Sequence, residues 1–139
     1  MASFNKFNAL VADIANKVHN LGSDTLKVML ANTAPGATNA VKADITEISA
    51  GNGYTAGGTQ ATLVSSSQSS GTYTLKLNNV TFTASAGSIG PFRYCVLYNA
   101  TPASGNLVGW YDYGTALTIT AGNSFQVQFD AVNGVVQLQ

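Results

Sequence analysis

The sequence has very little charge. Only 9% of its 139 residues are Asp, Glu, Lys or Arg, against roughly 25% in an ordinary soluble domain, and six basic side chains balance six acidic ones. These residues are scattered, so no basic patch would attract nucleic acid or an anionic membrane surface, and we expect neither partner. A neutral surface also lacks the repulsion that keeps proteins apart in solution, which favours association with other proteins or with further copies.

Cysteine and histidine are scarce as well, which limits the chemistry available. Cys95 is the single cysteine, so it allows no internal disulfide, and its place in the apolar run FRYCVLYN predicts that it is buried. His19 is the single histidine. One His and one Cys do not make a zinc site, and no Gly-x-Ser-x-Gly sequence presents a nucleophilic serine. We expect neither a metal nor a cofactor.

Long apolar runs are also missing. No run approaches the roughly 18 residues that a membrane-spanning helix needs. The first residues, MASFNKFNAL, lack the basic flank, apolar core and small-residue cleavage site of a secretory signal. We therefore expect synthesis in the cytoplasm without a signal peptide.

The apolar residues that are present predict one N-terminal amphipathic helix. They recur at helical spacing, with Ser3 as the expected N-cap and Gly22 placed to end the helix. We expect residues 1–21 to form this helix, packed on or extending from a β domain of residues 24–139, with the whole chain as one domain. The apolar stripe consists of Phe4, Phe7, Leu10, Val11, Ile14, Val18 and Leu21.

After Gly22 the pattern changes to short alternating runs broken by Gly, Asn, Ser and Pro. This pattern predicts a mainly β fold, an antiparallel β-sandwich or barrel that is jelly-roll-like. Residues 92–98 are apolar on both faces, as in a central strand. Ser65–Gly71 is expected to be an exposed loop between two strands, and Asn133-Gly134 predicts a hairpin leading into the last strand.

The stretch GNGYTAGGT, residues 51–59, resembles a phosphate-binding loop only superficially. Thr59 and Gln60 stand where a Walker A loop needs Lys and then Ser or Thr, and one extra residue breaks the dinucleotide pattern G-x-G-x-x-G. We interpret the glycines as turn residues at the edge of a sheet. Asn52 and Tyr54 are candidate partner contacts if they are exposed on this loop.

Two pairs of carboxylates are the remaining candidates for catalysis. Asp44 with Glu47, or Asp112 with Asp130, could in principle serve glycoside hydrolysis. Neither pair has a distinguishing context, and we expect turn and strand-end positions for them. The sequence therefore does not predict an enzyme.

Aromatic side chains cluster in LVGWYDY, where Trp110, Tyr111 and Tyr113 are candidate partner contacts. Strand alternation places Trp110 and Asp112 on one face and Tyr111 and Tyr113 on the other. The sequence leaves open which pair faces the core. Because sugars stack on exposed aromatic rings, a carbohydrate-binding module is one interpretation.

Four segments together resemble the small virion structural proteins of tailed bacteriophages. They are FNKFNALVADIANKVHNLGSDTLKVML, ADITEISAGNGYTAGG, GPFRYCVLYNATP and LVGWYDYG. The resemblance implies a capsid decoration or cement protein on the capsid surface of the virion, which binds the major capsid protein lattice and stabilises the head as a homo-oligomer, a dimer or a trimer. The alternative is a phage tail or host-surface module that recognises carbohydrate through Trp110 and the nearby tyrosines.

Overall fold

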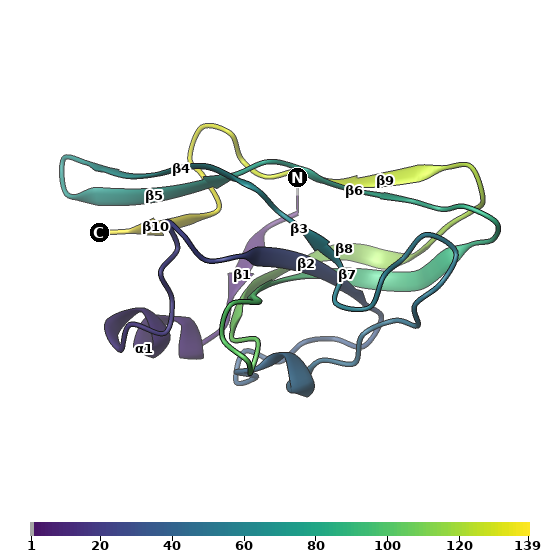
Figure 1. Cartoon of the computed structure of the whole chain (residues 1–139), viewed down its shortest axis with the longest axis horizontal. Helices are drawn as coiled ribbons and strands as arrows, with labels where there is room; N and C mark the ends of the chain where they lie inside the picture. The colour runs from purple at the N-terminus through teal and green to yellow at the C-terminus, as the bar shows by residue number, and fades with distance from the viewer. Residues whose placement is uncertain (1) are drawn as a thin grey trace.

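Antiparallel strands make up most of the fold, which a computed structural model describes for residues 2–139 (Figure 1). The mainly β prediction and the presence of a helix near the N-terminus are confirmed. In chain order the elements are β1 (Phe4–Lys6), α1 (Ala9–Ala15), β2 (Leu26–Ala31), the 3-10 turn η1 (Lys42–Asp44), β3 (Thr59–Gln60), β4 (Leu63–Ser69), β5 (Thr72–Leu77), β6 (Val80–Thr83), β7 (Ile89–Asn99), β8 (Leu107–Ile119), β9 (Ser124–Val127) and β10 (Val136–Leu138).

The strands form three sheets in two layers. One layer is a five-stranded sheet in the order β1-β8-β7-β2-β3. The other holds the three-stranded sheet β10-β5-β4 and the two-stranded sheet β6-β9, which lie over the first layer in Figure 1. Across residues 2–139 these sheets do not close into a barrel. The β4–β5 hairpin reaches beyond the five-stranded sheet, on the side where α1 lies.

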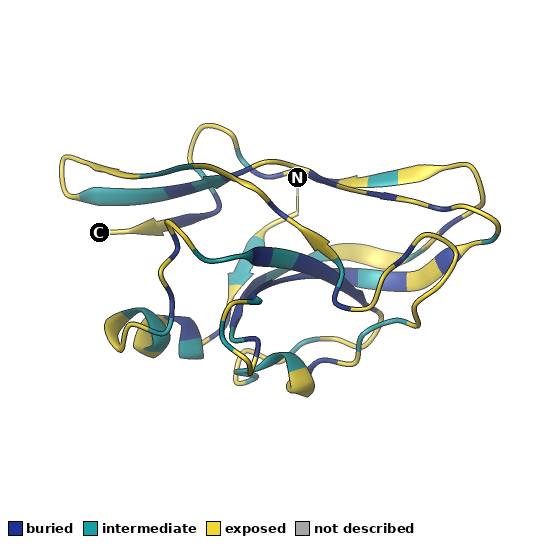
Figure 2. Ribbon diagram, in the orientation of Figure 1, coloured by how far each residue is buried: buried dark blue, intermediate teal, exposed yellow. Residues whose placement is uncertain are grey.

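Strand β7 is the centre of the five-stranded sheet, as its apolar sequence predicts. It pairs with β2 along Leu26–Ala31 and with β8 on its other side. One face of this sheet contributes to the main core between the layers, and the other packs on a smaller cluster that includes Met29 and Val96. Figure 2 shows the buried residues concentrated on β2 and β7. Cys95 is buried as predicted, and burial raises the pKa of its thiol to about 12.

The N-terminal helix is much shorter than predicted. Residues 4–6 form β1, with Phe4 opposite Tyr111 of β8, and the helix ends before Lys17, whose φ of 63° is left-handed. Asn8 occupies the N-cap position in place of Ser3. Pairing with β8 lets Phe4 pack on the main core while Phe7 enters the smaller cluster. A single helical stripe could not supply both clusters.

Two loop predictions are also wrong. The serine-rich segment belongs to β4, which pairs with β5 around a tight turn at Ser70 and Gly71, both with positive φ. The last strand does not form a hairpin with the strand before it, because β10 pairs with β5. The turn at Gly134 instead directs the Val135 N–H to the carbonyl oxygen of Leu75.

Gly58 is where the glycine-rich loop meets β2. Its φ is +75°, and a Cβ there would overlap the carbonyl oxygen of Val28. β3 begins at the next residue and pairs with Lys27 and Val28. Only glycine allows this close backbone approach, so Gly58 sets the position of β3 against β2.

We predict that Gly58→Ala lowers the free energy of unfolding by about 3 kcal/mol or more, because the added methyl forces β3 away from β2. Gly122→Ala is the matched control: its φ is +84°, and a Cβ there meets no atom within 4 Å. That control should cost only about 1 kcal/mol, the conformational penalty for alanine. Denaturant unfolding of the two variants measures the difference, and equal losses would contradict the role given to Gly58.

Candidate functional site

The glycine-rich loop is fastened to the five-stranded sheet by side-chain hydrogen bonds. The Tyr54 hydroxyl accepts from the Leu30 N–H (3.0 Å) and donates to Glu47 Oε1 (2.7 Å). Glu47 Oε1 also accepts from the Gly57 N–H (2.5 Å), while the Tyr98 hydroxyl donates to the Gly57 carbonyl (2.7 Å). Tyr54 is only 3% exposed, so it does not meet the condition of exposure for a partner contact. Burial and the bond to Glu47 raise its pKa.

Asn52, the other candidate on this loop, is exposed but holds a turn. Its φ is 55°, and its Nδ2 donates to the Ser88 carbonyl (3.0 Å). The Asn52 carbonyl accepts from the Ser85 N–H (2.9 Å). These bonds join the loop to the segment that leads into β7. The structure thus gives both loop candidates a role within the fold.

The aromatic candidates of β8 lie on two faces of one strand. The Trp110 ring packs on Phe7, with the ring centroids 4.6 Å apart, and on the smaller cluster. Tyr111 packs on the main core, and its burial raises its pKa to about 12. Tyr113 is 50% exposed and meets Phe125 edge-on at 5.6 Å. Both faces of β8 are therefore packed against other side chains at Trp110 and Tyr111, and Tyr113 is the most exposed of the three aromatic candidates.

Every one of the six acidic side chains accepts hydrogen bonds from the chain itself. Backbone N–H groups lower the pKa of Asp44 and Asp130, and Arg93 lowers that of Asp112. No group of three or more His, Cys, Asp and Glu within residues 2–139 is placed to hold a metal ion. The donors are Asn106 to Asp13, Asn20 and Asn99 to Asp24, Ala40 and Val41 to Asp44, Tyr54 and Gly57 to Glu47, Arg93 and Gly114 to Asp112, and Val132 and Asn133 to Asp130.

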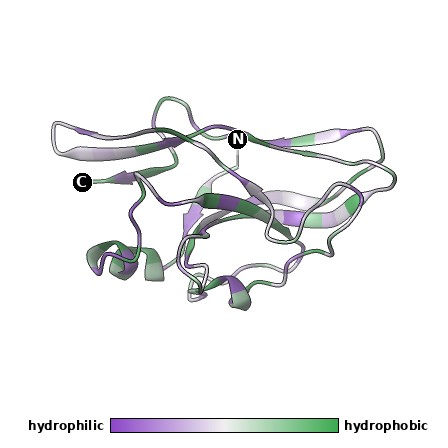
Figure 3. Ribbon diagram, in the orientation of Figure 1, coloured by the Kyte–Doolittle hydropathy of each residue, from purple (hydrophilic) through white to green (hydrophobic). Residues whose placement is uncertain are grey.

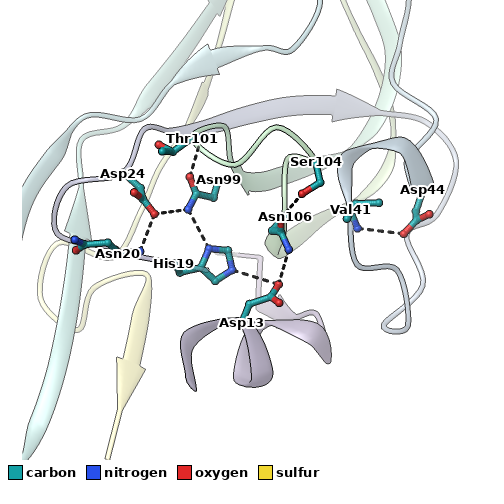
Figure 4. A network of polar contacts seen from close by, with 10 residues as sticks. All are labelled: Asp13, His19, Asn20, Asp24, Val41, Asp44, Asn99, Thr101, Ser104 and Asn106. Carbon is teal, nitrogen blue, oxygen red and sulfur yellow. Dashed lines mark hydrogen bonds and ion pairs between the residues drawn. The ribbon is translucent and has the colours of Figure 1, made fainter. Parts of the chain in front are cut away.

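His19 lies in a buried polar network that joins three parts of the fold (Figure 4). Its Nδ1 is 3.1 Å from Asn99 Nδ2, which also donates to Asp24 Oδ2 (2.5 Å). Asn99 Oδ1 accepts from the Thr101 N–H, so the amide presents its NH₂ to His19 and Nδ1 must be the acceptor. The proton of the neutral ring then sits on Nε2, which faces Asp13 Oδ2 at 3.7 Å.

This network places the imidazole where its charged form is disfavoured. The His19 side chain is 0% exposed. Burial lowers its pKa below the ordinary value of 6.5, although Asp13 and Asp24 act in the opposite direction. Through its bond with Asn99 the ring links the segment after α1 to the end of β7, and its Nε2 has no hydrogen-bond partner among residues 2–139. Its role is to hold these elements together in the neutral form.

An open cleft of about 460 Å³ lies between α1 and the β10-β5-β4 sheet. Apolar side chains from separate elements contribute most of its surface, and Lys17, His19, Asn20 and Ser66 are its polar residues; no Asp or Glu of residues 2–139 lines it. No local sequence pattern indicates this cleft, because it depends on how the β4–β5 hairpin lies relative to α1 (Figure 1). Its apolar lining comes from Ile14, Leu21, Tyr73 and Leu138.

We predict that Tyr54→Phe destabilises the protein by about 2 kcal/mol, because it leaves the buried Leu30 N–H without an acceptor and removes a donor to Glu47. Tyr73→Phe is the matched control, since its hydroxyl makes one part-buried bond to Ser66. The control should cost about 1 kcal/mol or less. Thermal or denaturant unfolding distinguishes the two, and a loss in the control as large as in Tyr54→Phe would contradict the anchoring role.

Stability should fall in mild acid because of His19. Its pKa is lower in the folded state, so the unfolded chain takes up a proton first as the pH drops. The stabilisation is complete above the unfolded pKa and is lost as the pH falls from about 7 through the unfolded pKa toward the lower pKa of the folded state, at no more than about 1.4 kcal/mol per pH unit. Denaturant unfolding across this range should show the slope in the wild type and not in His19→Gln; the same slope in both would contradict this assignment.

Comparison with known proteins finds no matching family, no similar curated protein and no similar solved structure.

Proposed function

We propose that this protein is a non-enzymatic structural protein of the bacteriophage virion. In this proposal it is a capsid decoration protein that binds the outside of the major capsid lattice as a homo-oligomer and stabilises the head. The observation that carries the non-enzymatic part is the use of all six carboxylates in internal hydrogen bonds. The segments that resemble phage virion proteins supply the virion part.

The carboxylates matter because acid–base and metal chemistry both need groups free to meet a substrate or an ion. Here Asp24 and Glu47 are turned into the fold, and Asp112 is held by a bidentate pair with Arg93 at 2.7 and 2.9 Å. His19, the single imidazole, has no exposed side-chain surface. This distribution of polar groups suits a protein that acts by contact.

A neutral surface also suits binding to a repeated lattice. A shell displays many copies of one site, so an oligomer that engages several copies gains avidity without a tight single contact. Such contacts depend on shape and on burial of neutral surface, which the 9% content of charged residues favours. This is the physical mechanism that we propose for head stabilisation.

Carbohydrate recognition receives less support from the geometry. Sugar stacking needs an open aromatic face, whereas Trp110 packs on Phe7 and Tyr111 packs on the main core. Tyr113 alone keeps about half of its surface exposed. Decoration of a protein lattice is therefore our preferred function, and glycan binding becomes an outcome of the test.

The proposal is tested by co-sedimentation of the purified protein with phage heads that lack it. We expect saturable binding at a fixed ratio to the major capsid protein and a rise in the temperature at which the heads disrupt. Heads that already carry a full complement of the protein are the control and should bind no more.

Two results would overturn this proposal. Absence of binding to depleted heads would exclude head decoration, and a tryptophan fluorescence change on titration with glycans would point to Trp110 and the carbohydrate alternative. Fluorescence reports on Trp110 because it is the single tryptophan of the chain.

A further inference from the structure

Strand β4 has the longest regular free edge in the described part of the chain. It pairs with β5 on one side and with no strand on the other. Its residues are neutral, and after a register shift between Leu63 and Ser65 the pairing is regular as far as Ser69. Natural proteins usually protect such edges with charge, proline, bulges or short strands. From Ser65 to Ser69, β4 has none of these.

The other free edges are protected by their length or by their irregularity. β3 has two residues, β1 and β10 have three each, and β6 and β9 have four each, whereas β4 has seven, of which the five from Ser65 to Ser69 pair regularly. The exposed part of β8 is interrupted, because its register with β7 shifts between Asp112 and Leu117. Figure 2 shows most of β4 exposed. Figure 3 shows mostly pale colours, which mark intermediate hydropathy, along the β4–β5 hairpin.

The backbone groups of alternate β4 residues point away from β5. The Leu75 carbonyl accepts from the Val135 N–H, so the backbone of Leu75 faces β10 and cannot also face β4. Ser66 stands opposite Leu75 in the register. Because hydrogen-bonded and non-bonded pairs alternate in an antiparallel ladder, the N–H and C=O of Ser66 and Gln68 are directed to the free edge.

We propose that the free edge of β4 pairs antiparallel with β4 of a second copy of this chain. The two three-stranded sheets would then join into one sheet of six strands across a two-fold axis. Such a contact is isologous, so each edge closes the other and no free β4 edge is left to propagate a filament. In the context of the proposed function, this contact would build the homo-oligomer, but it is formed and measured without a capsid.

A second copy fits this edge better than another partner because β4 is complementary to itself. Ser65, Ser67 and Ser69 carry small uncharged side chains, so two strands can lie side by side without like-charge repulsion. No other free edge within residues 2–139 offers a comparable regular length. Antiparallel pairing would also bring Leu63 and Val64, 44% and 56% exposed, beside the hairpin end of the other copy.

The test uses the full chain and a proline that blocks only the outer edge. Ser66→Pro removes the outward N–H and leaves the bonds between β4 and β5, whereas Ser66→Ala keeps that N–H and loses only the side-chain bond to Tyr73. Sedimentation equilibrium should show a dimer, or a multiple of dimers, for the wild type and for Ser66→Ala. Ser66→Pro should halve the mass while its circular dichroism remains native.

A double variant, Ser67→Lys with Ser69→Lys, covers the case in which the proline variant does not fold. In antiparallel self-pairing these lysines lie close to the lysines of the other copy and repel them. At low salt the double variant should therefore sediment with half the wild-type mass, and it should regain the wild-type mass as added salt screens the repulsion. A monomeric wild type would overturn the proposal, as would an oligomer that keeps its mass in a folded edge variant. If the wild type is a dimer and the edge variants lose it, but the dimer does not bind capsids, only the proposed function is contradicted.

Discussion

The outer edge of β2 is the constraint on which much of the structure depends. β2 is almost wholly buried, yet β3 pairs with it only at Lys27 and Val28. The backbone groups that remain must find partners, because an unpaired buried amide costs as much as a lost hydrogen bond. They find them in the segment between β2 and β4: the Leu30 N–H donates to the Tyr54 hydroxyl, and the Leu30 carbonyl accepts from the Ile48 N–H.

This solution also explains how the polar residues are used. At Leu30 the Tyr54 hydroxyl takes the place of a neighbouring strand as acceptor, and the proton of this buried hydroxyl needs an acceptor in turn. Glu47 is that acceptor, and the same carboxylate oxygen also accepts from the Gly57 N–H. Beside the other end of β2, Asp24 accepts from the Asn20 N–H and from Asn99, whose amide also contacts His19. In a chain with six acidic residues, all six accept hydrogen bonds from within the fold.

The sequence was most informative where local pattern and tertiary environment agree. The apolar run around Cys95 predicts a strand covered on both faces, and the structure confirms β7 there. Helical spacing from Phe4 to Leu21 was misleading, because Phe4 and Phe7 reach two clusters through a strand that pairs 105 residues away in sequence, at Trp110. The serine-rich β4 lacks the alternation that identifies strands. No local signal shows that Tyr54 is buried or that a cleft opens beside α1.

The scarcity of charge also determines how this fold protects its sheet edges. Proteins commonly place lysine on an edge strand, but this chain has only six Lys and Arg residues together. It relies instead on short strands such as β3 and β10 and on the irregular register of β8. A seven-residue neutral strand is the exception to that protection, and free backbone groups on it favour a partner strand wherever one is available. Short strands and irregular register thus limit the other edges of this fold, whereas β4 leaves a regular run of outward backbone groups without a partner strand within residues 2–139.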